Sequence, residues 1–193
     1  MDVMQAIQAR RSIRWFQPDA LSRTDIESIL EAARLAPSAK NGQPWRFVVV
    51  QGPARQSMAE ALSAGLARSR AENLPTGSAE YSFRIMAEAP ATLLVFDPDD
   101  QPPWQPKDAR GQLMLMVNSQ SVGAAVQNML LRAQELGIGS LWICDILFAH
   151  EELCAWAGRQ GLLAAAVSLG YAAEQPFARP RLAFEDIVEW RQD

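Results

Sequence analysis

The sequence predicts a mixed fold of α-helices and β-strands in one domain. Four apolar runs have the length and β-branched character of buried strands, and they cover residues 45–50, 91–96, 139–143 and 162–171. The segments between them repeat apolar residues at helical spacing. A chain of 193 residues, 49% hydrophobic and 21% charged, is long enough for a sizeable core and typical of soluble globular proteins. We therefore expect a single domain over residues 1–193.

Two capped helices are expected before the first strand. Asp2 precedes a short segment with one apolar face and can accept hydrogen bonds as its N-cap. Ser22 can cap a second helix, in which Asp25 is an acidic variant of the capping box. This helix must end before Pro37, because the residue before a proline disfavours helical backbone.

The helical signal varies between the first and third strands. Gly52-Pro53 opens a helix that fades into a loop or a mobile helical excursion at residues 67–81, a candidate lid over a site. Residues 81–88 predict a short helix. The prolines within residues 97–107 predict an irregular connection.

A long helix is expected from residue 109 to residue 136, with Gly137 as its C-terminal cap. Residues 112–131 lack charge and are numerous enough to span a bilayer. Polar side chains within this stretch would be costly in lipid, and they are Gln112, Asn118, Ser119, Gln120, Ser121, Gln127 and Asn128. We therefore expect no membrane insertion, but a buried helix shared with the core or with a partner subunit.

The C-terminal end follows a short helix expected at residues 151–157. Val188 and Trp190 are apolar residues that need a cover from water. A second subunit embraced by this tail could supply it, and so could the chain's own core.

Composition and charge exclude several classes of function. The net charge of −4 argues against nucleic acid or an anionic membrane surface as the main partner. Cys144 and Cys154 form neither a disulfide framework nor a zinc pattern, and we expect no metal site. The first residues lack the basic and apolar run of a signal peptide, so we expect a cytoplasmic protein.

Familiar catalytic constellations are also missing from the sequence. His150 is the only histidine and lies beside Glu151 and Glu152, which argues against a serine or cysteine triad and favours a surface or capping residue. Gly137-Ile138-Gly139 follows a helix and lacks the third glycine of a dinucleotide fingerprint.

The segment Arg10-Arg11-Ser12-Ile13-Arg14 is a candidate anion site. Guanidinium groups match phosphate oxygens, so Arg10 and Ser12 could hold a phosphate while Arg14 reaches another part of the same ligand. The alternative is a solvated basic helix end, since cations favour that position.

A second candidate is the loop of residues 36–45, whose prolines fix its corners before the first strand. Ser38, Asn41 and Gln43 offer both donors and acceptors, which suits a heterocycle, although a plain connection is the alternative. The sequence thus offers a candidate anion site and a polar loop, but no evident acid–base residues. This combination favours a protein in which a bound cofactor carries out the reaction.

These motifs together resemble the FMN-dependent nitroreductases. The resemblance covers about fifty N-terminal residues in order and spacing, with Arg10–Arg14, Ala32–Ser38, Asn41 and Gln43-Pro44-Trp45. It extends to residues 123–142 and to Arg179-Pro180-Arg181 with the tail beyond it. Residues 66–82 and 97–109 match nothing diagnostic, and in this family such regions shape the substrate pocket.

The resemblance implies an α+β sandwich: a central mixed sheet flanked by helices, in an intertwined homodimer with FMN at the interface. It assigns Arg10, Ser12 and Arg181 to the FMN phosphate, with Arg179 as a helper. Arg11 would lie along the ribityl chain or ring edge, and Arg14 at the N1/O2 edge. The remaining implied contacts come from Pro37, Ser38, Asn41, Gln43, Leu141 and Trp142.

The implied activity is an oxidoreductase that takes hydride from a transiently bound NADH or NADPH. Nitroaromatics, quinones or similar small electrophiles would be reduced by a ping-pong mechanism, without a protein nucleophile. The alternatives are another reaction on the same fold, namely reductive dehalogenation, dehydrogenation or oxygen-dependent flavin breakdown, and a flavin-binding protein without turnover.

Overall fold

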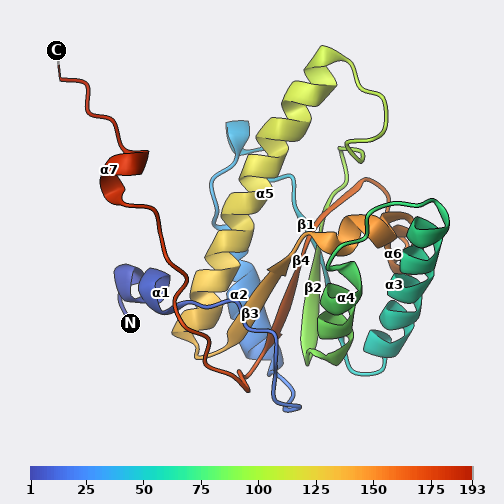
Figure 1. The fold of residues 1–193 in the computed structure, drawn as a ribbon, viewed down its shortest axis with the longest axis horizontal. Coiled ribbons are helices and arrows are strands. Elements are labelled where there is room, and N and C mark those ends of the chain that lie inside the picture. Colours follow the sequence, from blue (N-terminus) through green and yellow to red (C-terminus); the bar gives the residue numbers. More distant parts are fainter. Residues whose placement is uncertain (193) are drawn as a thin grey trace.

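The computed structural model describes residues 1–192 and places a four-stranded sheet between two layers of helices (Figure 1). The strands are β1 (Arg46–Gln51), β2 (Ala91–Asp97), β3 (Gly139–Ile143) and β4 (Leu162–Gly170). The α-helices are α1 (Val3–Ala9), α2 (Arg23–Arg34), α3 (Ala54–Ala71), α4 (Ala79–Glu88), α5 (Ala109–Glu135), α6 (His150–Ala157) and α7 (Phe184–Ile187). Two 3₁₀ turns, η1 (Ala39–Asn41) and η2 (Asp145–Ala149), complete the elements. The expected α+β sandwich is confirmed.

The sheet has the strand order β1-β2-β4-β3, and its three strand pairs are antiparallel. The sheet is therefore antiparallel, and the expectation of a mixed sheet is wrong; the parallel contact between Ser12 and Ser140 is an isolated bridge outside the named strands. That bridge remains isolated because the segment after α1 runs beside the edge strand β3 only briefly before it turns away.

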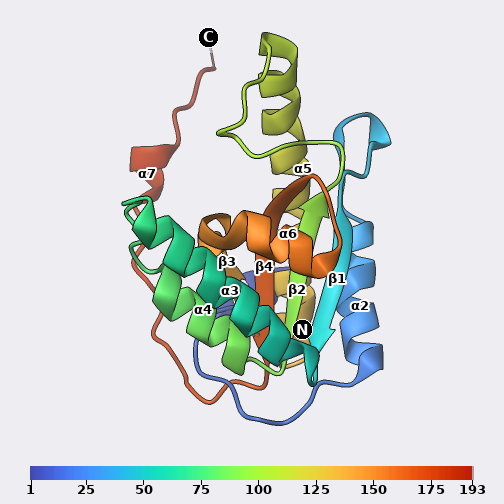
Figure 2. The same cartoon turned by 90° about the vertical axis from the view of Figure 1, so that its right-hand side faces the viewer.

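The two central strands are buried on both faces. In β2, Leu93 and Val95 pack with α2 and α5, whereas Leu94 and Phe96 pack with α3, α4 and α6. Alternate side chains of a strand point to opposite faces, so a continuous apolar run fits a sheet covered on both sides. Figure 2 shows the second helical layer, with α3, α4 and α6 in front of the sheet.

The predicted helix caps are confirmed. The Asp2 side chain accepts from the backbone N–H of Gln5 at 2.8 Å, and the Gln5 side chain completes the capping box. The Ser22 hydroxyl accepts from the N–H of Asp25 at 3.0 Å. Gly137 has φ +73°, the left-handed backbone that favours glycine after a helix.

Two predictions about the helices need correction. Residues 67–71 continue α3, so the predicted irregular segment begins only at Glu72. The long helix α5 is buried only from Ser121 onward, and in its first half Leu113 and Met116 are exposed to 58% and 61%. Figure 1 shows that this half extends beyond the sheet. Within residues 1–192, every helix is too short or too polar to cross a bilayer.

The C-terminal segment does not dock on the chain's own core, which excludes one of the two expected covers. It leaves the body past α1 and α5 and carries α7 away from the sheet (Figure 1). Phe177 is 95% exposed and Trp190 is 73% exposed. Apolar side chains held in water in this way indicate a surface that another molecule covers.

Candidate functional site

The first wall of the site is the chain that follows α1. Arg10 is the C-cap of α1, and its ψ of 130° directs the next residues into an extended path. The N–H of Ile13 then donates to the carbonyl oxygen of Ser140 at 3.0 Å, which fixes this path to the edge of β3. The helix-end interpretation therefore holds only for Arg10, and the other arginines lie on an extended segment.

The second wall is the chain that follows β4. The carbonyl of Tyr171 accepts from the N–H of Gln17 at 2.8 Å, and the N–H of Ala173 donates to the carbonyl of Trp15 at 2.9 Å. Main-chain pairing thus joins residues 171–173 to residues 15–17, and the chain beyond them continues along the segment after α1. It brings the Arg-Pro-Arg motif beside the N-terminal arginines.

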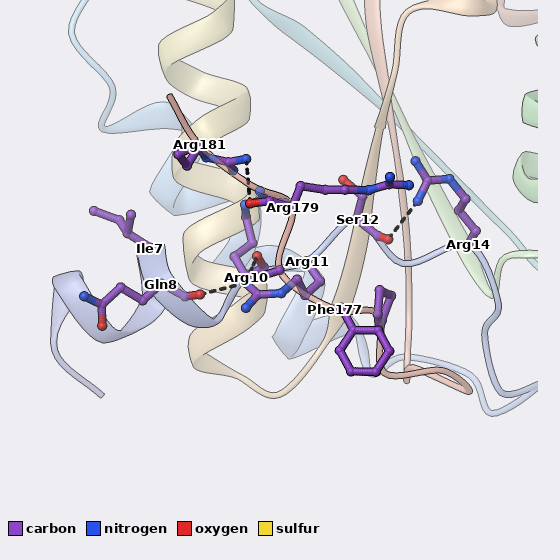
Figure 3. A pocket seen from close by; sticks show the side chains of 11 residues that line it. Ile7, Gln8, Arg10, Arg11, Ser12, Arg14, Phe177, Arg179 and Arg181 are labelled. Carbon is purple, nitrogen blue, oxygen red and sulfur yellow. Dashed lines mark hydrogen bonds between the residues drawn. The ribbon is translucent and has the colours of Figure 1, made fainter. Parts of the chain in front are cut away.

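A cavity of about 420 Å³ lies between these two walls (Figure 3). Half of the residues predicted to bind a cofactor line it, and they are Arg10, Arg11, Ser12, Arg14, Arg179 and Arg181. Figure 3 shows that these side chains come from both segments and surround one space. We call this space the arginine cavity.

The guanidinium groups of the arginine cavity lack carboxylate partners at salt-bridge distance within residues 1–192. Two of them bond instead to backbone carbonyls: Arg11 donates to that of Gln8 at 2.7 Å, and Arg14 donates to that of Ser12 at 3.1 Å. Burial lowers the pKa of Arg10, and the cations of Arg11 and Arg181 lower it further. Such crowding favours a bound anion that would neutralise it.

The predicted polar loop lies outside the arginine cavity. Its η1 turn sits beside α5, where the N–H of Ala39 donates to the Ser121 hydroxyl at 3.4 Å. Figure 1 places this light-blue segment near the middle of α5, away from α1. Within one chain, Pro37, Ser38, Asn41 and Gln43 therefore do not meet the predicted phosphate site.

The loop nevertheless has an unusual backbone. Lys40, Asn41 and Gln43 adopt positive φ values of 51°, 56° and 48°, a conformation that side-chain-bearing residues rarely take. The Ser38 hydroxyl holds this shape by accepting from the N–H of Gln43 at 3.0 Å. Strain of this kind is often found where a loop contacts a ligand or partner, and the side chains of Asn41 and Gln43 are exposed.

The two residues predicted on β3 point in opposite directions. Leu141 is buried in the core with α3 and α4. Trp142 faces α5 near Gly123 and remains 39% exposed. The Trp142 side chain is therefore available to a ligand, whereas the Leu141 side chain is occupied by the core.

Comparison with known protein families identifies the family to which this chain belongs. The model described as the nitroreductase family matches residues 7–171, a range that contains the first wall of the arginine cavity, the polar loop and all four strands. The chain belongs to the nitroreductase family.

Individual relatives agree with this assignment. A protein of Archaeoglobus fulgidus, assigned by name as an NADH dehydrogenase/NAD(P)H nitroreductase, is 33% identical over 180 residues, covering 90% of this chain and 87% of its own. A solved structure from Desulfovibrio desulfuricans, assigned as a nitroreductase in complex with FMN, is 31% identical with a TM-score of 0.73, covering 100% and 99% of the two chains. The FMN-dependent nitroreductase NfnB of Mycobacterium smegmatis, solved with NADPH, is 22% identical with a TM-score of 0.77 over 98% and 97%, and it shares the fold.

Sequence reasoning missed several residues of this nitroreductase-family site. Gln8 and Phe177 also line the arginine cavity, and Glu174 on the second wall accepts a hydrogen bond from the backbone N–H of Arg14. Gln8 precedes the arginine segment on α1, so its position could have been inferred from the cluster. Glu174 carries no pattern that would distinguish it from a surface acid.

His150 was predicted as a surface or capping residue, and the surface alternative is wrong, although its backbone forms the C-cap of the η2 turn. The imidazole is buried, with Nε2 accepting from the N–H of Leu163 at 3.2 Å. The Trp104 ring packs edge-on against it at 5.5 Å. Burial lowers the pKa of His150, although Gly161 and the neighbouring Glu151 and Glu152 act in the opposite direction.

The buried imidazole predicts a loss of stability in acid. The pKa of His150 is lower in the folded than in the unfolded chain, so the unfolded chain takes up the proton first as pH falls below about 6.5. In urea unfolding at about pH 7.5 and about pH 5.5, the wild type should lose more stability between the two pH values than His150→Gln. Glutamine keeps an acceptor for the Leu163 N–H. Equal losses in the two proteins would contradict this assignment.

Proposed function

We propose that residues 1–193 form one FMN-binding domain that acts as an NAD(P)H-dependent oxidoreductase. It takes hydride from NADH or NADPH and reduces a nitroaromatic, a quinone or a similar small electrophile. The observation that carries this proposal is the arginine cavity, in which several cations converge without carboxylate partners among residues 1–192. Family membership and the FMN bound by the Desulfovibrio relative support the same ligand.

The donors of the arginine cavity fit the phosphate of FMN. Arg10, Ser12 and Arg181 offer guanidinium and hydroxyl donors on both walls, with Arg179 as a helper. A phosphate dianion between these walls would relieve the repulsion that lowers the pKa of Arg10. Arg11 then lies along the ribityl chain or the edge of the ring.

FMN supplies the chemistry of hydride transfer when bound. Arg14 would place its charge at the N1/O2 edge of the ring, where negative charge develops on reduction, and so make reduction easier. Its guanidinium has only the Ser12 carbonyl as a partner among residues 1–192, so it is available for this contact. The nicotinamide and the acceptor would occupy the same space in turn, which gives ping-pong kinetics.

The rest of the flavin site would come from a second subunit in an intertwined homodimer. The strained loop carrying Pro37, Ser38, Asn41 and Gln43 cannot reach the arginine cavity of its own chain. The exposed apolar residues of α5 and of the tail supply a surface for such a partner. Trp142 on β3, half-exposed near α5, would complete the ring contact.

Sedimentation of the purified protein tests the dimer. We expect about twice the mass of one chain at micromolar concentration, because the exposed apolar side chains of the tail and of α5 need a cover. A monomer that nevertheless binds FMN with its full set of contacts would contradict the role assigned to the partner's loop.

The visible spectrum tests the proposed function itself. Purified protein should show flavin bands that bleach on anaerobic addition of NADH or NADPH and return when a nitroaromatic or quinone is added. A colourless protein that stays colourless with added FMN would exclude the proposal. Bound FMN without NAD(P)H oxidation would favour a non-catalytic flavin protein, and oxygen consumption with free reduced flavin would favour flavin breakdown.

A further inference from the structure

Glu174 joins the two walls of the arginine cavity, although it is not among the residues proposed to bind FMN. Its Oε1 accepts from two successive backbone N–H groups, those of Arg14 and Trp15, the second at 3.1 Å. The two ends of this contact are 160 residues apart in sequence. One carboxylate oxygen thus fixes the backbone of the residue that is expected to face the flavin ring.

The position of Glu174 is also distinctive. Main-chain hydrogen bonds join the walls at Gln17 and Trp15, and Glu174 continues this pairing by one step with its side chain. Beyond it, within residues 1–192, no main-chain hydrogen bond joins residues 175–181 to residues 10–14. Glu174 is therefore the last link before the walls separate to form the arginine cavity.

Trp15, the second residue bound by Glu174, has a further contact through its ring. The Arg84 guanidinium stacks over the Trp15 ring at 5.4 Å and over the Tyr81 ring at 5.0 Å. The Glu174 carboxylate is not in an ion pair with Arg14, since no salt bridge joins them in the described chain. Its contact fixes the Arg14 backbone without engaging the Arg14 guanidinium, which donates to the Ser12 carbonyl.

We propose that Glu174 is a positioning residue of the flavin site. It fixes the backbone from which the Arg14 side chain enters the arginine cavity, and its negative charge moderates the effect of Arg14 on flavin reduction. This assignment rests on the proposed function. It predicts that the geometry and the charge of Glu174 have separate, measurable effects.

Glu174→Ala and Glu174→Gln separate these two effects. Alanine removes the acceptor, so amide exchange at Arg14 and Trp15 should become faster, and FMN should bind about fivefold more weakly. Glutamine keeps an acceptor oxygen and loses the charge. It should preserve both exchange and FMN affinity, while the flavin becomes about threefold easier to reduce at equilibrium. Glu60→Gln, an exposed residue on α3, serves as the matched control and should change none of these.

The outcomes distinguish this assignment from the proposed function. If the wild type takes up FMN and Glu174→Ala matches it in exchange and affinity, Glu174 is not a positioning residue, although the flavin function stands. An unchanged reduction equilibrium in Glu174→Gln would refute the role of its charge. If the wild type takes up no FMN, the proposed function fails, and the exchange measurement alone still decides whether Glu174 fixes the Arg14 backbone.

Discussion

Arg10→Ala is expected to weaken FMN binding by about 30-fold. Charge-assisted hydrogen bonds contribute about 1.5–3 kcal/mol, and about 2 kcal/mol corresponds to this factor. The same substitution should leave the stability of the FMN-free protein unchanged or slightly raised. It removes a partly buried cation that lies near those of Arg11 and Arg181.

This combination of effects is the signature of a ligand-binding cation. FMN fluorescence titration of the apo protein measures the affinity, and urea unfolding without FMN measures the stability. Arg23→Ala is the matched control, because Arg23 is exposed and paired with Glu27 at 2.7 Å. A variant of Arg10 that binds FMN as the wild type does would remove the phosphate assignment.

Arg14→Ala is expected to make the bound flavin harder to reduce while the fold is kept. We expect the two-electron midpoint potential to fall by about 30 mV, which corresponds to about 1.4 kcal/mol. The physical cause is the loss of a cation beside the ring edge where negative charge develops, in a partly desolvated site. Arg14 is half-buried, so solvent reduces this effect without abolishing it.

Spectroelectrochemical titration of the holoprotein measures this change. Arg14→Lys keeps the positive charge on a more flexible side chain and should recover most of the lost potential. If the alanine and lysine variants have the same potential as the wild type, Arg14 does not act on the flavin. If the midpoint potential falls equally in the alanine and lysine variants, Arg14 acts through its geometry and not through its charge.

Much of the fold could be predicted because its signals are local. The caps at Asp2 and Ser22, the proline limit at Pro37 and the apolar runs of the strands each depend on a few neighbouring residues. The apolar run of β2 also predicted a buried strand, and the two helical layers cover both of its faces.

The site was predicted only in part, because its parts come together through tertiary structure. Arg10 and Ser12 could be interpreted from their spacing, but their link to Arg181 came from the family resemblance. Glu174 has no local signal, because its role depends on hydrogen bonds from two backbone N–H groups that are distant in sequence. His150 was misjudged because its acidic neighbours suggested solvent, whereas the opposing segment at Leu163 buries it.

The pairing of residues 15–17 with residues 171–173 also has a kinetic consequence. Contacts between segments so distant in sequence cost the most loop-closure entropy and tend to form late in folding. The arginine cavity should therefore be absent from partially folded intermediates, even those in which β1 and β2 are already paired. Uptake of FMN during refolding would then report the completion of the native topology, and not its beginning.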